Sequence, residues 1–230
     1  MPQNQKDQQR PCAYCGASTG RNQREHVVPK CVYASRATIP GGPLTVPTCP
    51  SCNHRFSKHE AHFRNVVAAC GPSPSAPRHE LIEKTMRSFR NPKSGRGDLQ
   101  RLWRQITDSA VPKPDGTPYK QVMPHMDDDV RFIARKVVRG LVHSLDWHTV
   151  IPDNRVIVRE FIDPPEEVTD VIEPGYCVPG QFSSHYVLID ERFAEEFRRD
   201  MHSYWQIKFF DLELTCLVVQ KALPPLDADG

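Results

Sequence analysis

The chain has 230 residues, of which 38% are hydrophobic and 25% are charged, and its formal net charge is +2. This composition suits a soluble globular protein with a sizeable core, and no apolar run approaches the roughly 20 residues that a membrane span needs. The small net charge excludes a chain that is basic over its whole surface. Any contact with nucleic acid must therefore come from local basic patches.

The N-terminal segment 1–10 is polar and rich in glutamine, and it lacks the apolar core of a signal peptide. We expect it to be a disordered tail. The chain has eight cysteines, whereas secreted disulfide scaffolds are usually shorter and denser in cysteine. We therefore expect a cytoplasmic protein whose cysteines are reduced or bound to metal.

Two Cys-x-x-Cys pairs organise the next segment, which we expect to be a module over residues 11–70. Cys12 and Cys15 form the first pair, and Cys49 and Cys52 form the second. Two turns that each present two thiolates supply the four ligands of a tetrahedral structural Zn²⁺ site. The alternative is four unrelated free thiols, which the paired spacing disfavours.

Between the cysteine pairs, the sequence predicts a β-hairpin. The dipeptide Glu25-His26 precedes two valines, so that His26 begins a segment suited to a strand. A Pro-Gly-Gly-Pro turn at 40–43 leads into a return strand at 46–48. A surface histidine beside a surface glutamate is the alternative interpretation of the dipeptide.

A helix should follow the second cysteine pair, from Ser51 or Asn53 to about Val67. Phe56, Phe63 and Val67 recur at helical spacing and share one face, which should pack into the core.

The polar residues of this helix occupy two other directions. Asn53, Ser57 and Glu60 share a flank, but Glu60 lies about 10 Å beyond Asn53 along the axis, so we expect that the two do not bind one ion. His59 and His62 point away from Asn53. We expect both histidines to be exposed to solvent or to contact phosphate.

These motifs together resemble those of the HNH endonucleases, the ββα-metal nucleases, in their zinc-stapled form. The resemblance covers residues 12–65 and depends on CAYC, EHVVPK, the PGG loop and CPSCN, in that order. It implies that His26 is the general base that activates water. It also implies that Glu25 and Asn53 hold one catalytic Mg²⁺ or Mn²⁺ ion.

The chain departs from the family pattern at one point. The family has an asparagine in the return strand, whereas the corresponding stretch 44–48 has none, and Thr45 or Thr48 are the polar residues available in its place.

Basic residues surround the motif and are suited to hold backbone phosphates. We expect DNA contacts from Arg24, Lys30, Arg55 and Lys58, and the neighbouring Arg21 belongs to the same group.

Residues 71–126 are expected to be a linker with short helices. Gly71–Pro77 has linker composition, helices are expected at 78–90 and 99–106, and 112–118 should be a turn.

The segment 127–147 has the clearest helical periodicity in the chain. Asp127, Asp128 and Asp129 suit the positive end of the helix dipole, and a metal site is the less favoured alternative. A row of basic residues follows the polar flank of this helix, and we interpret it as a solvated face in preference to a phosphate-binding stripe. The row comprises Arg131, Arg135, Arg139 and His143.

The rest of a C-terminal α+β domain, expected over residues 127–223, should contain antiparallel strands. Strands are predicted at 156–161, 185–189 and 205–219, with a short charged helix at 191–201 and a tail at 224–230. The four unpaired cysteines are expected to be small buried hydrophobic residues. They are Cys31, Cys70, Cys177 and Cys216.

The hypothesis from the sequence is thus an α+β protein with an N-terminal HNH module that cleaves DNA with a divalent ion. Restriction or phage defence is the role that analogy suggests. One alternative is a zinc-dependent nucleic-acid-binding module without catalysis. Another is a structural protein in which zinc only folds the N-terminus. The C-terminal domain is a candidate surface for a homodimer or a protein partner.

Overall fold

The computed structural model describes residues 10–18, 23–34, 39, 41–70, 75–122, 127–147, 149–160, 172–188 and 201–219. The first half contains β1 (Gln23–His26), the 3-10 turn η1 (Lys30–Val32), β2 (Thr45–Thr48), α2 (Pro50–Ala69), α3 (Ala76–Phe89), α4 (Gly95–Trp103), β3 (Ile106–Pro112) and β4 (Pro118–Val122). The second half contains α5 (Asp128–Val142), the π-helical turn η3 (His143–Trp147), the 3-10 turn η4 (Asp153–Arg155), β5 (Val156–Glu160), β6 (Glu173–Val178), β7 (Phe182–Leu188), β8 (Met201–Phe209) and β9 (Leu212–Val219).

The protein is a mixed α+β fold, and every strand pair in its described part is antiparallel. β1 pairs with β2, β3 pairs with β4, and the remaining strands form a five-stranded sheet in the order β5-β9-β8-β7-β6. The predicted α+β class with antiparallel strands is confirmed. The hairpin β1–β2 leads directly into α2, because Pro50 follows the N-cap residue Cys49.

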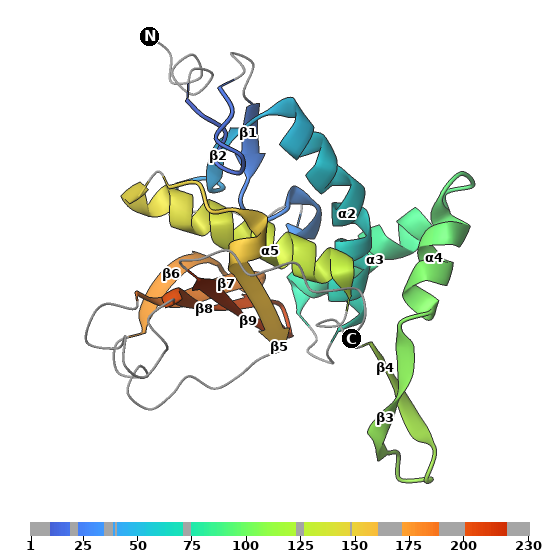
Figure 1. Cartoon of the computed structure of the whole chain (residues 1–230). Coiled ribbons are helices and arrows are strands. Elements are labelled where there is room, and N and C mark those ends of the chain that lie inside the picture. Colours follow the sequence, from blue (N-terminus) through green and yellow to red (C-terminus); the bar gives the residue numbers. More distant parts are fainter. Residues whose placement is uncertain are drawn as a thin grey trace, which may run out of the picture.

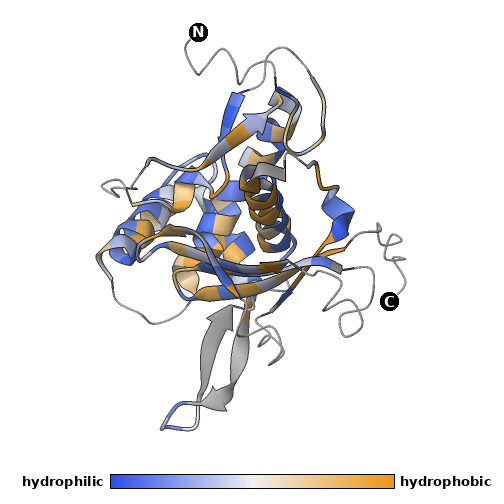
Figure 2. Ribbon diagram, turned by 90° about the vertical axis from the view of Figure 1, so that its left-hand side faces the viewer, coloured by the Kyte–Doolittle hydropathy of each residue, from blue (hydrophilic) through white to orange (hydrophobic). Residues whose placement is uncertain are grey.

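Helix α5 lies between the N-terminal elements and the five-stranded sheet (Figure 1). Its predicted apolar stripe is buried. Hydrophobic residues gather on the elements at the centre of the molecule (Figure 2). Gly140 permits its close approach to the N-terminal elements, since an added Cβ would lie 3.0 Å from Val27 and from the Tyr14 hydroxyl. The buried hydrophobic residues form one cluster that extends from Cys12 to Val218. The predicted domain boundaries remain predictions.

The helix predictions are confirmed for α2, α3 and α5, with two differences at the ends. Ala76 and Pro77, predicted as linker, form the first turn of α3, and Ser75 is its N-cap. Helix α4 spans 95–103 and not 99–106. It begins at Gly95, in the stretch between the two helices predicted at 78–90 and 99–106.

The single strand predicted over 205–219 is wrong, because β8 and β9 are joined by a tight turn at Phe210 and Asp211. The turn has no sequence signal: Phe210 adopts φ 54°, a conformation that bulky residues rarely take. Tertiary contacts hold it, since Phe210 N donates to Gln181 O and Arg78 of α3 pairs with Asp211 at 2.6 Å.

Two further structures were not predicted. Strand β6 includes Pro174 and Gly175, residue types that weaken a strand signal, and the hairpin β3–β4 flanks the predicted turn at 112–118.

Cys177 is exposed, so its predicted burial is wrong, whereas Cys216 is buried and Cys31 and Cys70 are partly buried. The helix predicted at 191–201 lies outside the described residues except Met201, which begins β8.

Replacing Phe63 tests the contact between α2 and the sheet. Phe63 is fully buried and packs edge-on against Phe209, with ring centroids 5.0 Å apart. We expect Phe63→Ala to lower the free energy of unfolding by about 3–5 kcal/mol, through lost burial and the cavity left behind. Urea unfolding measures this, with Met86→Ala at a half-exposed position of α3 as the control. A loss no larger than that of the control would contradict the packing.

Candidate active site and metal centre

The four paired cysteines meet at one point, as the sequence predicts. All four sulfur atoms lie within 4.8 Å of one another, and Cys15 Sγ is 3.7 Å from Cys49 Sγ. Tetrahedral Zn–S bonds of about 2.3 Å place two sulfurs about 3.8 Å apart, so the cluster fits a Zn²⁺ ion. Backbone bonds set the first turn, since Cys12 N donates to Ala17 O and Gly16 N donates to Cys12 O.

The electrostatics of the cluster also suit a cation. Burial is the largest effect that raises the pKa of Cys15 and Cys52, and the neighbouring thiols raise it further. Burial acts in the same direction on Cys49, but hydrogen bonds from Cys52 and from the other thiols lower the Cys49 pKa. A divalent cation favours the thiolate form of all four, so metal binding would release protons.

A buried ion-pair triad joins β1 and α2 to α5. Lys136 of α5 is fully buried, and its Nζ lies 2.5 Å from Glu25 Oε1 and 2.8 Å from Glu60 Oε1. The ammonium also lies over the Phe56 ring, 5.2 Å from its centroid. Burial raises the pKa of Glu25, although Lys136 acts in the opposite direction. One lysine thus joins β1 and α2 to α5.

His26 follows Glu25 at the end of β1 and lines a cavity of about 560 Å³. The cavity is lined by His26, Lys30, Tyr33, Ala34, Ile39, Gly42, Pro43 and Lys84. Burial lowers the pKa of His26, and the nearby ammonium groups of Lys30 and Lys136 lower it further. The imidazole is therefore neutral at neutral pH, and its Nδ1 is buried without a hydrogen-bond partner among the described residues.

The other predicted ligand, Asn53, contacts a different partner from Glu25. Its Nδ2 donates to Gln23 Oε1 at 2.7 Å, near the start of β1, whereas Glu25 contacts Lys136. Among the described His, Cys, Asp and Glu side chains, Glu25 belongs to no group of three whose ligand atoms all lie within 4.8 Å of one another. Glu25 and Asn53 thus have different partners in this structure, and their joint binding of an ion stays a prediction.

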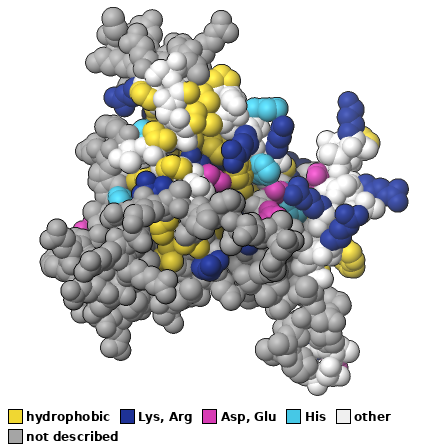
Figure 3. All heavy atoms as spheres, in the orientation of Figure 1, with side chains coloured by type: hydrophobic (Ala, Val, Ile, Leu, Met, Phe, Trp, Pro, Cys, Tyr) yellow, Lys and Arg dark blue, Asp and Glu magenta, His cyan; other side chains and the backbone are white. Residues whose placement is uncertain are grey.

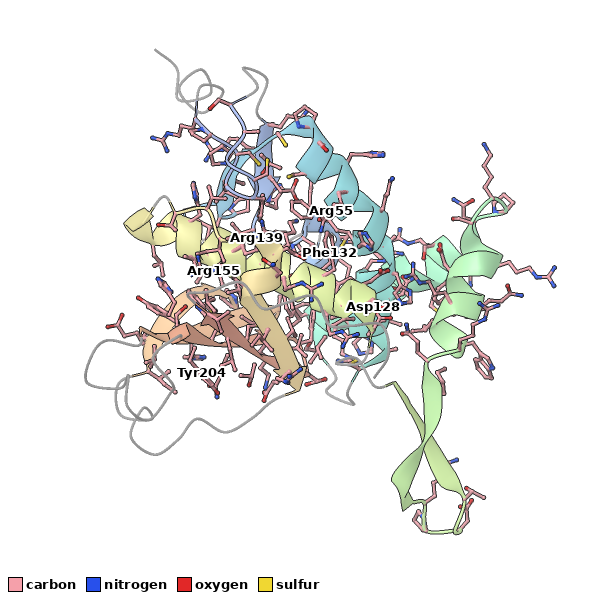
Figure 4. All side chains as sticks on the ribbon, viewed as in Figure 1. Arg55, Asp128, Phe132, Arg139, Arg155 and Tyr204 are labelled. Carbon is pink, nitrogen blue, oxygen red and sulfur yellow. The ribbon has the colours of Figure 1, made fainter. Side chains whose placement is uncertain are left out.

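The four predicted phosphate-binding residues are all exposed, and two of them, Arg24 and Arg55, also contact other side chains. Arg24 Nε donates to Thr45 Oγ1 at 2.8 Å, and Lys30 and Lys58 are exposed. Arg55 lies over the Phe132 ring of α5, 4.6 Å from its centroid, and its side chain is 58% exposed (Figure 4). Arg21 lies outside the described residues.

The prediction that the basic row on α5 is a solvated face is wrong for its second half, which consists of Arg139 and His143. Arg139 is buried: it donates to Ile151 O at 2.6 Å and to Tyr14 O, and it pairs with Asp153 at 2.9 Å. His143 is buried too. No pattern in the sequence indicates these partners, because Tyr14, Ile151 and Asp153 all lie outside the helix.

Two histidine–aspartate pairs join α2 to the start of α5. His62 Nε2 lies 2.9 Å from Asp127 Oδ2, and His59 Nδ1 lies 2.7 Å from Asp129 Oδ1. His62 is 3% exposed, so the prediction that both histidines face solvent or phosphate is wrong. The pairs were missed because they join residues about 65 positions apart.

The helix-start interpretation of the aspartates is confirmed, since Asp127 Oδ1 accepts a bond from Val130 N at 2.8 Å. Asp129 Oδ2 lies 2.7 Å from an Arg101 guanidinium nitrogen. His62, Asp127 and Asp129 also have ligand atoms within 4.8 Å of one another. Each carboxylate nevertheless has a charged or hydrogen-bonding protein partner, so this cluster is explained as a structural connection.

Comparisons with protein-family models, with curated proteins and with solved structures find no match to this chain. None of the helices in the described ranges combines the length and apolar character needed to cross a membrane.

The cysteine cluster leads to a prediction about metal content. We expect one tightly bound Zn²⁺ per chain by elemental analysis, and its removal by a chelator should unfold the N-terminal elements, as judged by circular dichroism. Cys12→Ser should abolish the zinc content, because Cys12 is one of four converging ligands. Cys177→Ser, at an exposed cysteine outside the cluster, is the control and should keep the ion. A Cys12→Ser protein with full zinc content would contradict the site.

The Lys136 triad predicts a large and pH-dependent loss of stability in Lys136→Met. Removing the ammonium leaves two carboxylates without their cation, which should cost about 3–5 kcal/mol at pH 7. A carboxyl whose pKa is raised by folding stabilises the protein below its unfolded pKa, and this stability is lost as the pH rises through the folded pKa. The deficit of the variant should therefore shrink between pH 7 and pH 4.

Urea unfolding at both pH values measures this deficit, with exposed Lys58→Met as the control. An equal deficit at pH 4 and pH 7 would mean that lost packing, and not the unpaired carboxylates, destabilises the variant.

Proposed function

We propose that the chain is a metal-dependent HNH-type endonuclease that hydrolyses DNA phosphodiester bonds. The observation that supports this most is the position of His26. It ends β1 of a hairpin that leads into α2 beside a four-cysteine cluster, and it lines a cavity with Lys30 and Lys84. A role in restriction or phage defence is consistent with such an activity and rests on analogy alone.

In this proposal, His26 acts as the general base. A neutral imidazole can take a proton from the water that attacks phosphorus, and the lowered pKa of His26 keeps it neutral near pH 7. Lys30 and Lys84 line the same cavity and would attract the phosphate. Glu60 lies close enough to affect the His26 pKa in the opposite direction, which favours the imidazolium after proton transfer.

The metal requirement comes from the resemblance to HNH endonucleases. A divalent ion held by Glu25 and Asn53 would stabilise negative charge on the phosphate and on the leaving 3′ oxygen. Those two side chains contact different partners in this structure, so binding a shared ion would require each to exchange its present contact. Any ion at Glu25 must compete with the Lys136 ammonium for the same carboxylate.

The second candidate is a zinc-dependent nucleic-acid-binding module without catalysis. Two observations favour it: the return strand 44–48 lacks the family asparagine, and Glu25 is paired with a lysine. This candidate assigns no role to the cavity at His26, which is why we place it second.

Plasmid cleavage with Mg²⁺ or Mn²⁺ tests the proposal. We expect the wild type to nick or linearise the plasmid and His26→Ala to lose about 10²-fold or more of that rate, because proton abstraction by a positioned base is worth this much. The rate should rise with pH through a midpoint below the ordinary histidine pKa of about 6.5 and then level off, since only neutral His26 accepts a proton.

The matched control is His185→Ala, an exposed histidine on β7, which should cleave at the wild-type rate. Variants are compared at equal zinc content and equal helicity. Cleavage by His26→Ala at the wild-type rate would contradict the assignment of His26 as the general base. Binding of DNA without cleavage by any variant favours the second candidate.

A further inference from the structure

One segment of the chain is far more basic than the whole. Residues 84–104 contain seven lysines and arginines and one acidic residue, whereas the chain as a whole has a formal charge of +2. The seven are Lys84, Arg87, Arg90, Lys93, Arg96, Arg101 and Arg104, and all but Lys84 are exposed. Lysine and arginine side chains project from the part of the molecule where α4 lies (Figure 3). This segment is a local basic surface of the kind that phosphate backbones select.

Most of these charges have no acidic partner within the part of the chain that the structure describes. Lys84 lies 3.5 Å from Glu80, and Arg101 pairs with Asp129. The other five form no ion pair with another described residue. A dense set of like charges that are left unneutralised costs free energy through mutual repulsion, and an anionic ligand would relieve that repulsion.

The backbone fixes the angle between the two helices that carry the charges. Asn91 N donates to Ser88 O at 3.0 Å, and Gly95 N donates to Asn91 O at 2.9 Å. A Cβ on Gly95 would lie 2.1 Å from Phe89 O, so only glycine fits where the end of α3 meets the start of α4. The two helices and this tight turn follow one another in helix-turn-helix order. The hairpin β3–β4 comes next and extends away from the rest of the molecule (Figure 1).

The exposed face of α4 combines charge with apolar area. Arg96, Leu99 and Trp103 follow one another at i, i+3 and i+7 and share one face, about a quarter turn around the helix from the buried Leu102. Trp103 is 69% exposed and Leu99 is 45% exposed. Large exposed apolar side chains set among arginines are typical of a binding surface.

The basic surface is continuous with the cavity at His26. Lys84 lines that cavity and is also the first residue of the basic segment. From Lys84, the row continues through Arg87 to Arg90, about 9 Å farther along α3 and its end. One bound polyanion could therefore contact α4 and reach His26.

We propose that α4 and the adjoining end of α3 form a docking surface for duplex DNA, with the exposed face of α4 toward the major groove. The proposal deepens the function proposed above and rests on it for the identity of the polyanion. Arg87, Arg90 and Lys93 would contact backbone phosphates, and Arg96 and Trp103 would face the groove. The surface would place the duplex so that one phosphate enters the cavity at His26.

Fluorescence polarisation with a labelled 30-base-pair duplex tests the surface in the absence of divalent ions, so that no cleavage occurs. Arg90→Glu/Arg96→Glu should weaken binding about tenfold or more at 150 mM salt. It should also lower the slope of log Kd against log salt by about 1, because Arg90 is the phosphate contact that is lost and each such contact contributes about 0.9.

The matched control is Arg159→Glu/Lys208→Glu, which changes the net charge by the same amount at exposed positions of the five-stranded sheet. It should bind nearly as the wild type does. Equal weakening by the two double variants would overturn the proposal, because net charge alone would then explain the effect. Tighter binding of single-stranded RNA than of the duplex would also overturn it, as would failure of the wild type to bind any duplex.

The two proposals can fail separately. Suppose that the wild type binds the duplex without cleaving DNA, and that Arg90→Glu/Arg96→Glu weakens this binding. This result would support the docking surface and contradict the proposed nuclease activity. Plasmid cleavage that is lost in His26→Ala but unaffected by Arg90→Glu/Arg96→Glu would overturn the docking surface and leave the nuclease standing.

Discussion

The fold depends on one buried charge, the ammonium of Lys136. It enters the core from α5 and is held by Glu25 of β1 and Glu60 of α2, so three elements from distant parts of the chain must meet within hydrogen-bonding distance. A buried ion pair adds little net stability, but losing one partner is costly. The triad therefore acts as a constraint on position: arrangements that separate α5 from the hairpin leave a buried charge unpaired.

Helix α2 contacts both the cysteine cluster near its N-terminus and helix α5 farther along its length. Near its N-terminus, Cys49 and Cys52 anchor it to the cysteine cluster, and Glu60 then reaches Lys136. Farther along, His62 binds Asp127 at the N-cap of α5. The cysteine cluster, the Lys136 triad and the start of α5 are thus connected through one helix. The N-terminal elements and the five-stranded sheet share a core because α5 contributes apolar side chains to both.

The sequence predicted what is local and missed what is distant. The Cys-x-x-Cys spacing, the periodicity of α5 and the apolar face of α2 each depend on residues within a few turns, and all are found in the structure. Lys136 gave no signal, because its partners lie 111 and 76 positions away. The buried Arg139 and the Phe210 turn were missed for the same reason: their conformations are fixed by tertiary contacts that no short window contains.

The pairing of Glu25 with Lys136 also bears on which chemistry the cavity supports. Burial is the main cause of the lowered pKa of His26, and a lysine that stays on Glu25 adds to the positive charge near His26 that lowers this pKa further, so that the imidazole stays neutral. A divalent ion that displaced Lys136 would supply more charge but would also leave the ammonium buried without its carboxylate, at a large cost. Binding of a phosphate could offset that cost, because a second anion would then share the ammonium. Ion binding and DNA binding at this site should therefore be coupled, each strengthening the other.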